Sequence, residues 1–337
     1  MSVLHHLACS PETVVRGWLT PHARPVLHIA SGDRVGIDTV NAAGLPEQDV
    51  APWLLSQGIA PEGAVLELLA ILRTVEKGPG PHVLTGPIWV EGAMPGDVLA
   101  VEVLSVAPRA PLYGINFSRP GAGSLPQLLT APWRRLMPIH ADGQSACFKP
   151  GLDLPLAPFM GIMGVSPTAP VSSIPPGLFG GNLDLKDLRP GARLYLPVQV
   201  AGGLFYTGDG HGLQAHGEAN LTALECAMHC ELRFVLHQRR LLIGPLAETE
   251  DDYLVLGLDA DLNLAATQAV ARSVGILQWA ARLGVAEAYA LSSLVVDFEI
   301  TQLVDGVKGV HGRIPKHLLP GPEGGAGRYW GPPPVSI

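Results

Sequence analysis

The sequence predicts an α+β fold that is rich in strands and contains several helices. Glycine occurs 40 times and proline 32 times, which divides the chain into short segments and favours strands and turns over a helical bundle. Hydrophobic residues make up 47% and charged residues only 15%, so long stretches must be buried. No internal repeat or polar linker divides the 337 residues. We therefore expect a single domain over residues 1–337, or two intimate lobes at about 1–200 and 201–337.

The first third of the chain predicts a hairpin, a helix and two further strands. Residues 24–41 alternate around a Ser-Gly-Asp turn, which predicts a hairpin with Asp38 on the face opposite its apolar neighbours. Residues 60–78 have a proline near the start, leucines at helical spacing and a glycine at the end, so they predict a helix. Residues 81–106 predict two strands joined by a Met-Pro-Gly-Asp turn at 94–97.

The rest of the chain alternates between predicted strands and predicted helices. Residues 107–160 are rich in proline and predict an irregular segment, and because loops of that length usually have a function, we expect this one to cover the site. Strands are expected at 159–167, 193–200, 232–244, 253–258 and 294–306, and helices at about 217–230 and 262–284.

Charge and composition exclude several classes of protein. The formal net charge of −8, without a cluster of lysine and arginine, argues against a nucleic-acid partner. The sequence contains no run of about 18 apolar residues, so we expect no membrane-spanning helix. The first residues lack the features of a signal peptide, and four cysteines are far too few for a disulfide scaffold, so we expect a cytoplasmic protein.

Two of the cysteines have a spacing that allows more than one interpretation. Cys226 and Cys230 lie four residues apart with His229 beside them. They could bind a metal ion, but no second cysteine pair accompanies them, and buried apolar thiols are the simpler interpretation. Cys226 could also act as a nucleophile, although no carboxylate that would orient His229 is indicated.

The stretch LFYTGDGHGLQAHGEANLTALECAMH, residues 204–229, concentrates side chains that bind metals or transfer protons. Asp209 and His211 follow an apolar strand, and alternate residues of extended backbone face the same way, so the two could share a divalent ion. A plain turn or a hydrogen-bonded pair would give the same triplet. Gln214, His216 and two glutamates follow at once, which strengthens the prediction of a site.

The two glutamates are candidates for proton transfer. Glu218 lies at the predicted start of the helix, and Glu225 lies about two turns later on nearly the same face. Glu218 could instead stabilise the helix N-terminus, and Glu225 could lie on a solvated face. The apolar neighbours of Glu225 favour burial, which would raise its pKa towards neutrality.

A glycine-rich loop and two isolated histidines complete the candidates. FGGNLDL, residues 179–185, offers backbone N–H groups, the Asn182 amide and the Asp184 carboxylate, which suits the binding of an oxyanion or of a metal-bound water. A plain turn capped by Asn182 is equally compatible with the pattern. His28 and His82 fit ordinary core or surface histidines.

Several motifs, taken in chain order, resemble the acetamidase/formamidase family. They are GPHVLTGPIWVEGAMPGDVLAVEV, FMGIMGVSP, GGNLDLKDL, LYLPVQVAGGLFYTGDGHGLQAHGE, TALE and DFEITQLVDGVKGVHGRIPK. The resemblance extends over about residues 25–317. It implies a metal-dependent hydrolase that cleaves the C–N bond of short carboxamides, in a strand-rich α+β fold and commonly as a homo-oligomer. A hydrolase of larger or cyclic amides, such as a lactam, and a non-catalytic binding protein stabilised by a metal remain as alternatives.

The resemblance also implies roles for individual residues. The metal ligands expected are Asp209 and His211, with His82 or Asp38 completing the shell of a divalent ion, for which we expect zinc. Glu218 or Glu225 is the expected general base and acid, Asn182 the expected oxyanion donor, and Gly180, Gly181, Asp184 and Gln214 the expected substrate contacts. The chain departs from the family after Asp38, where the family often has a Gly-Gly-rich turn, and at His216, where the family often has Asp.

Overall fold

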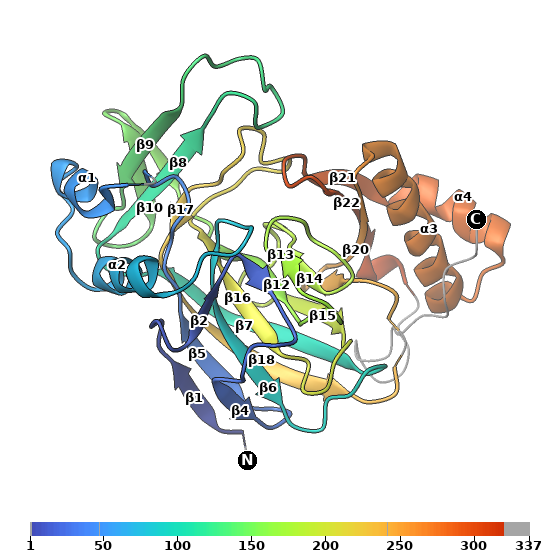
Figure 1. The fold of residues 1–337 in the computed structure, drawn as a ribbon. Helices are drawn as coiled ribbons and strands as arrows, with labels where there is room; N and C mark the ends of the chain where they lie inside the picture. The colour runs from blue at the N-terminus through green and yellow to red at the C-terminus, as the bar shows by residue number, and fades with distance from the viewer. Residues whose placement is uncertain (1, 47, 241, 320–337) are drawn as a thin grey trace.

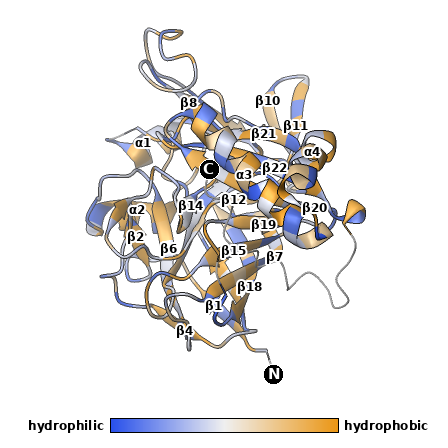
Figure 2. Cartoon of the chain, turned by 90° about the vertical axis from the view of Figure 1, so that its right-hand side faces the viewer, coloured by the Kyte–Doolittle hydropathy of each residue, from blue (hydrophilic) through white to orange (hydrophobic). Residues whose placement is uncertain are grey.

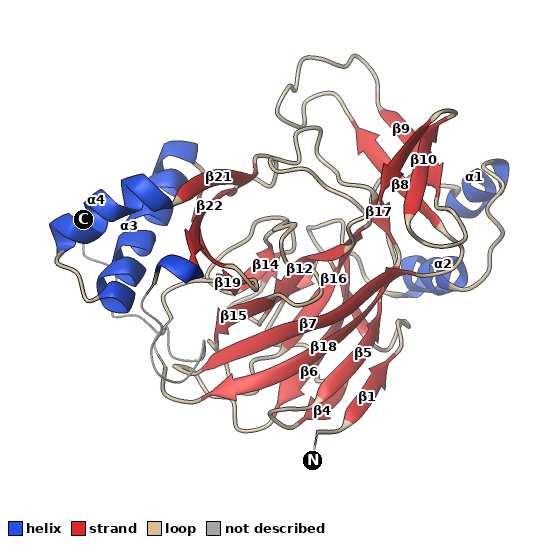
Figure 3. Ribbon diagram, turned by 180° about the vertical axis from the view of Figure 1, so that it is seen from behind, coloured by secondary structure: helices blue, strands red, loops and turns tan. Residues whose placement is uncertain are grey.

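The computed structural model describes residues 2–46, 48–240 and 242–319. Two large β-sheets pack against each other, and two pairs of helices lie at opposite ends of the molecule (Figure 1). The view from behind gives the same arrangement, with α1 and α2 at one end and α3 and α4 at the other (Figure 3). This architecture confirms the predicted strand-rich α+β fold.

The first sheet is nine-stranded within the described residues, and most of its neighbours are antiparallel. In spatial order its strands are β1 (Leu4–Leu7), β5 (Arg34–Asp38), β18 (Met228–His237), β7 (Val98–Pro108), β15 (Arg193–Pro197), β19 (Leu246–Glu248), β20 (Asp252–Asp259), β22 (Lys308–Pro315) and β21 (Asp297–Gln302).

The second sheet is also nine-stranded within the described residues, and it branches at β6, which pairs with β2, β4 and β16. Its strands are β14 (Gly180–Asn182), β12 (Phe159–Gly164), β16 (Phe205–His211), β17 (Glu225–Cys226), β8 (Tyr113–Ser118), β9 (Trp133–Pro138), β6 (Val83–Val90), β2 (Val14–Arg16) and β4 (Leu27–Ile29). Two small pairs accompany it, formed by β10 (Ser145–Lys149) with β11 (Leu152–Pro155) and by β3 (Trp18–Leu19) with β13 (Val171–Ser172).

The helices cover the ends of the sheets. They are α1 (Val50–Ser56), α2 (Ala64–Thr74), α3 (Leu262–Ala281), α4 (Val285–Val295) and the short 3₁₀ helix η1 (Lys316–Leu318). Asp261 caps α3 by accepting hydrogen bonds from two backbone N–H groups of its first turn. A Cβ on Gly257 of β20 would overlap the Ala265 carbonyl oxygen, so only glycine lets α3 pack this closely on the first sheet.

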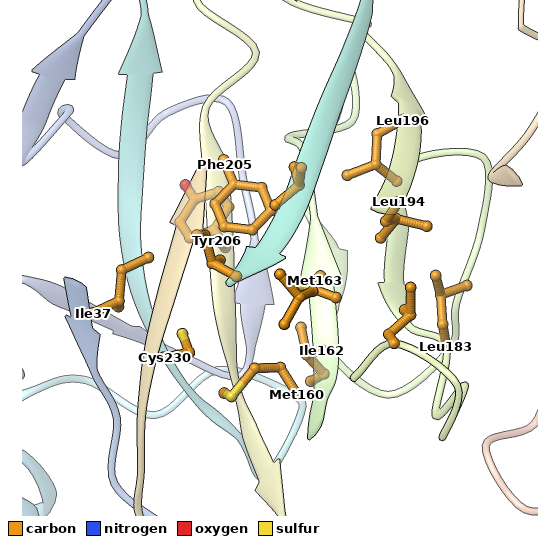
Figure 4. Close-up of a cluster of buried hydrophobic side chains, with 14 of the residues drawn as sticks. Ile37, Met160, Ile162, Met163, Leu183, Leu194, Leu196, Phe205, Tyr206 and Cys230 are labelled. Atoms are coloured by element: carbon orange, nitrogen blue, oxygen red, sulfur yellow. The ribbon is translucent and has the colours of Figure 1, made fainter. Parts of the chain in front are cut away.

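The main core lies between the two sheets. Figure 4 shows side chains of the first sheet, such as Ile37 and Leu194, close to side chains of the second, such as Ile162 and Phe205. Hydrophobic residues follow the strands β6, β7, β15 and β18 in the rotated view (Figure 2). Every residue of β12 is buried, because this strand has one neighbour on each side and is covered on both faces.

Both of the long predicted helices are confirmed, as α2 within 60–78 and α3 within 262–284. The predicted strands at 159–167, 193–200, 253–258 and 294–306 correspond to β12, β15, β20 and β21, and the strand expected at 232–244 begins earlier, as β18. The turn at 94–97 is confirmed by the hydrogen bond from Asp97 N–H to the Met94 carbonyl, but the strands it joins, β6 and β7, lie in different sheets.

The predicted hairpin over residues 24–41 is wrong. Its two strands exist, but β4 pairs in parallel with β6 of the second sheet, and β5 lies between β1 and β18 of the first. The Asp33 carboxylate accepts hydrogen bonds from the N–H groups of Val3 and Ala30, which ties the turn to the start of β1. The turn therefore passes the chain from one sheet to the other, and no local pattern specifies that choice.

The predicted helix at 217–230 is also wrong. Residues 217–224 form an irregular loop, followed by β17 and β18. Glu218 and Leu221 have φ values of +43° and +103°, which a right-handed helix does not allow. The leucines and alanines that suggested a helix lie in this loop, where Ala223 and Leu224 are buried, and between β17 and β18. The two glutamates therefore do not share a helix face.

The segment 107–160 is not irregular as predicted. It contains β8, β9, β10 and β11, and β8 pairs with β9 over six residues. Its connecting loop touches the loop after Glu218, where Ser124 N–H donates to the Ala219 carbonyl. Whether the segment covers the site stays a prediction. The division into two lobes also stays a prediction.

Among the described residues, none of the helices has the length and apolar character that a membrane span requires.

Candidate functional site

Six buried acidic and histidine side chains converge near the end of β16. We call them the site cluster: Asp184, Asp209, His211, Glu218, Glu225 and Asp305. None of them is more than 8% exposed. They form three overlapping groups of three, and within each group the metal-binding atoms lie within 4.8 Å of one another. The cluster therefore brings five carboxyl groups and one imidazole into one buried volume.

Strand β16 positions the two central members. Asp209 and His211 are separated by one residue, so both side chains point to the same side of the strand. His211 lies opposite Glu225 of β17 and opposite Phe159 of β12, whose ring meets the imidazole edge-on. Asp209 has φ +56°, a conformation that non-glycine residues rarely adopt and that is common where backbone strain serves a site. The strand register thus sets the His211–Glu225 contact.

A hydrogen-bond relay fixes the orientation of His211. The Gln214 amide donates from Nε2 to the Asp184 carbonyl at 3.0 Å, so its Oε1 faces His211 Nδ1 at 2.9 Å. Since Oε1 only accepts, Nδ1 carries a hydrogen and Nε2 points to the carboxylates. His211 Nε2 lies 3.3 Å from Asp209 Oδ2 and 3.5 Å from Glu225 Oε1. Metal-binding histidines are commonly held in this way by a partner on the other ring nitrogen.

Burial and crowding shift the acidity of the cluster. Burial raises the pKa of Asp184, Glu218 and Asp305, and their mutual repulsion adds to it for Glu218 and Asp305. Burial also raises the pKa of Glu225, which the positive His211 partly offsets, to about 7. Several of these carboxyl groups therefore keep a proton near neutrality unless a cation neutralises them.

The central pair behaves in the opposite way. Burial alone would raise the pKa of Asp209, but the imidazoles of His82 and His211 hold it well below its usual range. Burial alone would lower the pKa of His211, but the carboxylates of Glu225 and Asp209 raise it well above its usual value. A positive charge at His211 Nε2 is thus strongly favoured, and either a proton or a metal ion supplies it.

The cluster also has unpaired polar atoms, which test whether a metal fits. Its buried atoms without a hydrogen-bond partner among the described residues are Asp184 Oδ1, His211 Nε2, Glu218 Oε2, Glu225 Oε2 and Asp305 Oδ2. Each such atom costs about 1–3 kcal/mol when it stays unpaired. All but one are oxygens and the other is an imidazole nitrogen, which is a donor set that divalent cations such as zinc or manganese bind. The residues present therefore fit a divalent ion.

The structure brings most of the predicted site residues together. His82 Nε2 lies 3.9 Å from Asp209 Oδ2, while its Nδ1 bonds the Ser173 hydroxyl at 2.8 Å. Gly180 and Gly181 adopt φ values of +80° and +82° in β14, which only glycine tolerates well, and Asn182 ends that strand two residues before Asp184. The two glycines therefore contribute the backbone conformation of this segment and no side chain.

Asp38 does not join the site cluster. Its carboxylate pairs with His6 at 3.3 Å, His229 at 2.8 Å and Arg109 at 3.3 Å, in a separate group on the first sheet. The predicted hairpin places Asp38 on the face opposite its apolar neighbours, whereas β5 lies between β1 and β18, which carry those histidines. His28 pairs with the exposed Glu91, consistent with an ordinary surface histidine.

Two residues of the site escaped sequence reasoning. Asp305 lies in the turn between β21 and β22. The pair Asp305-Gly306 is typical of a hairpin turn, so nothing in the sequence indicated a site residue there. Gly161 of β12 packs directly against the cluster, because a Cβ there would lie 2.7 Å from both Asp184 Oδ1 and His211 Cε1. The only sequence signal for Gly161 was a glycine inside an otherwise apolar strand, which indicates a close backbone approach.

The cysteines lie near the cluster without forming a reactive site. The Cys226 thiol is buried and donates to the Leu224 carbonyl, and burial raises its pKa to about 12. Nearby His229 is bound to Asp38. Among the residues that the structure describes, none of the groups with metal-binding geometry contains a cysteine. Buried, unreactive thiols are thus the interpretation that fits.

Comparison with known proteins identifies the family. The chain matches the model of the Acetamidase/Formamidase family over residues 78–173 and 169–315. It is 24% identical to an acetamidase of Mycolicibacterium smegmatis over 209 residues, which are 44% of this chain and only about half (51%) of that protein. It is 24% identical to a formamidase of Methylophilus methylotrophus over 298 residues, covering 66% of this chain and 73% of that protein.

A solved structure extends the match to nearly the whole chain. The crystal structure of an acetamidase from Bacillus halodurans superposes with a TM-score of 0.78 and 28% identity, covering 93% of this chain and 97% of the other. The site cluster lies within the matched residues. The resemblance inferred from the sequence motifs is confirmed, and this chain belongs to the acetamidase/formamidase family.

Proposed function

We propose that this chain hydrolyses the C–N bond of short-chain carboxamides to a carboxylate and ammonia, with a divalent metal ion in the site cluster. The observation that carries the proposal is the buried cluster itself, with five carboxyl groups, one imidazole and a set of unpaired oxygen and nitrogen atoms. Membership of the acetamidase/formamidase family supports an amide as the substrate.

The residues that would hold the ion are those whose free atoms already converge. Asp184, Asp209 and His211 form one such group, and His82 stands beside Asp209. A bound divalent ion would supply Lewis-acid polarisation of the amide carbonyl and would acidify a water molecule. Zinc is the expected ion, since a mixed set of carboxylates and imidazole suits it.

Glu225 is the better candidate for the general base. Its Oε1 accepts a hydrogen bond from the Ala223 N–H at 2.9 Å, which leaves Oε2 free. With a pKa of about 7 it can take a proton from water and return it to the leaving nitrogen near neutrality. The pKa of Glu218 lies well above its usual value because of burial and the neighbouring Asp184 and Asp305, which disfavours the ionised form that a general base needs.

Asn182 would orient the substrate. Its side chain is 2% exposed, and its Oδ1 has no partner among the described residues. A primary carboxamide has two N–H groups, which can donate hydrogen bonds to this oxygen. If the side-chain amide of Asn182 rotates by 180°, its own N–H groups can donate to the developing oxyanion. Gln214 acts indirectly, because it bridges His211 and the backbone of Asp184.

The test is ammonia release by the purified chain from formamide, acetamide, longer amides and a small lactam, with and without a strong chelator. We expect release that the chelator abolishes, and the rank order of substrates separates short amides from larger or cyclic ones. His211→Ala should lose both the bound ion and activity, whereas His28→Ala, which removes an exposed paired histidine, should lose neither.

Two results would contradict the proposal. An active His211→Ala variant that still carries the ion would remove the site cluster from the mechanism. A fully metal-loaded wild type that releases no ammonia from any amide would favour the non-catalytic, metal-stabilised alternative. Assembly as a homo-oligomer stays a prediction, which light scattering of the same preparation tests.

A further inference from the structure

A second group of ligand-type side chains lies next to the site cluster but shares no member with it. We call it the second cluster: Asp187, His216, Glu299 and His311. Asp187 lies in the loop after β14, and His216 lies in the loop after β16. Glu299 of β21 lies directly opposite His311 of β22 in the strand register. The metal-binding atoms of Asp187, His216 and His311 lie within 4.8 Å of one another, and the Glu299 carboxylate lies beside both imidazoles.

The distances within the second cluster fit a tetrahedral ion. Glu299 Oε2 lies 2.7 Å from His216 Nε2 and 3.2 Å from His311 Nε2. Asp187 Oδ2 lies 3.8 Å and 4.0 Å from the same two nitrogens. A tetrahedral zinc ion with bonds of about 2.0–2.1 Å holds its ligand atoms about 3.3–3.4 Å apart, which lies in the middle of these four distances.

Neighbouring groups orient the ligands as metal sites require. His311 is fully buried, and its Nδ1 bonds the Thr301 hydroxyl at 2.8 Å, which directs Nε2 into the cluster. Arg313 donates to Asp187 Oδ1 at 3.0 Å, leaving Oδ2 free. Asp187 Oδ2 is buried and has no hydrogen-bond partner among the described residues.

Arg313 offers a competing explanation, since it also lies 3.4 Å from Glu299 Oε2 and could neutralise the cluster by itself. It does not account for Asp187 Oδ2, which faces both imidazole nitrogens at distances too long for hydrogen bonds. We propose that the second cluster binds a divalent cation, with zinc as the best fit, through Asp187 Oδ2, Glu299 Oε2 and the Nε2 atoms of His216 and His311.

The four protein ligands would fill a tetrahedral shell, which is the arrangement of a structural site. Asp187 lies three residues after Asp184, and His216 lies two residues before Glu218, both of the site cluster. Between them, Gly217 N–H donates to the Thr301 carbonyl of β21. A cation in the second cluster would therefore hold the loops that carry Asp184 and Glu218 against the β21–β22 hairpin that carries Asp305.

The test counts zinc in the full-length purified chain, stripped with a chelator and reloaded with zinc ions alone. We expect two zinc ions per wild-type chain by elemental analysis, one in His216→Gln, one in Glu299→Gln and one in His211→Ala. His28→Gln, a matched loss of a histidine paired to a carboxylate, should keep two. His216 and Glu299 are both half-buried, and two separate variants are used so that misfolding of one still leaves the other as a test. Circular dichroism checks the fold of each variant.

Thermal unfolding gives a second readout that does not depend on activity. Zinc should raise the midpoint of His211→Ala, which keeps the second cluster, by more than it raises the midpoint of the His211→Ala, His216→Gln double variant. A zinc count in His216→Gln and Glu299→Gln equal to that of wild type would overturn the proposal, as would a wild type with one zinc that only His211→Ala loses. Neither result bears on whether the site cluster hydrolyses amides.

Discussion

The site cluster and the second cluster are built from adjoining segments of the chain, yet they balance charge in different ways. In the second cluster Arg313 offsets the effect of burial and holds the pKa of Asp187 and Glu299 below their usual range. Within the described residues, no lysine or arginine forms an ion pair with any member of the site cluster. A fixed guanidinium gives permanent partial compensation of the carboxylate charge. A cluster without one depends on exchangeable protons or on a bound cation, and only a cluster of this second kind can take part in proton transfer.

The largest difference between the clusters should appear when one glutamate in each is replaced. Glu225→Gln should lower kcat/KM by about 10²–10⁴-fold, because it removes the carboxylate proposed to exchange protons. Glu299→Gln, the same change in the second cluster, should cost less than about tenfold, since it acts only through positioning. Steady-state ammonia release measures both, and equal losses in the two variants would show that the clusters do not differ in role.

The pH dependence of stability should have opposite signs in the two clusters. Burial raises the pKa of Glu225 to about 7, so in the metal-free chain the folded state keeps a proton that the unfolded state loses above about 4.5. Its contribution to the free energy of unfolding therefore falls as pH rises from 5 to 8, by on the order of 3 kcal/mol. His211, with a raised pKa, contributes stability that is also lost as pH rises.

His311 has the opposite effect, because burial and the nearby His216 lower its pKa to about 4. The unfolded state takes up a proton below about 6.5 and the folded state does not, so this contribution falls as pH decreases towards 4. Urea unfolding of the chelator-stripped protein at pH 5.5 and pH 8 measures the balance. In the Glu225→Gln variant, the free energy of unfolding should increase less between pH 8 and pH 5.5 than it does in wild type. The same increase in both proteins would be inconsistent with a raised Glu225 pKa.

A smaller effect should come from the tight packing of the site cluster against β12. A Cβ added at Gly161 would lie 2.7 Å from Asp184 Oδ1 and from His211 Cε1, and both atoms belong to buried side chains. Gly161→Ala should therefore displace these two side chains and lower kcat/KM by up to about 10²-fold. Gly284→Ala is the control, since its nearest neighbour would be 3.4 Å away, and it should leave kcat/KM unchanged.

The smallest effect should come from Cys226, although it follows Glu225 directly. Its thiol is buried, has a pKa of about 12 and donates to the Leu224 carbonyl, so it takes no part in the chemistry proposed. Cys226→Ala should keep kcat/KM within about tenfold of wild type, with any loss coming from packing. Rapid inactivation of the folded wild type by a thiol reagent, absent from the variant, would reverse this view.

The sequence predicted the parts of the site that depend on local chain geometry. Asp209 and His211 were recognisable because a strand ends in alternating polar side chains, and Asn182 because glycines precede it. The helix at 217–230 failed because its leucines and alanines lie in a loop that distant segments hold in place. The Leu224 N–H donates to the Leu213 carbonyl, and Glu225 of β17 pairs with β16 and β8. Asp38 was misplaced for the same reason, since pairing with β1 and β18 determines its neighbours.

The wide spacing of the site cluster along the chain has a consequence for its synthesis. Its members run from Asp184 to Asp305, and the second cluster closes only with His311. On the ribosome, the site cluster stays incomplete until Asp305 has been synthesised, and the second cluster until His311 has been synthesised. A cation bound by either cluster, as proposed, could therefore not guide the folding of the segments that precede Asp184 while they are being synthesised. Loading would be a late maturation step, so chains made under metal starvation should accumulate as folded, inactive protein that recovers when the ion is supplied.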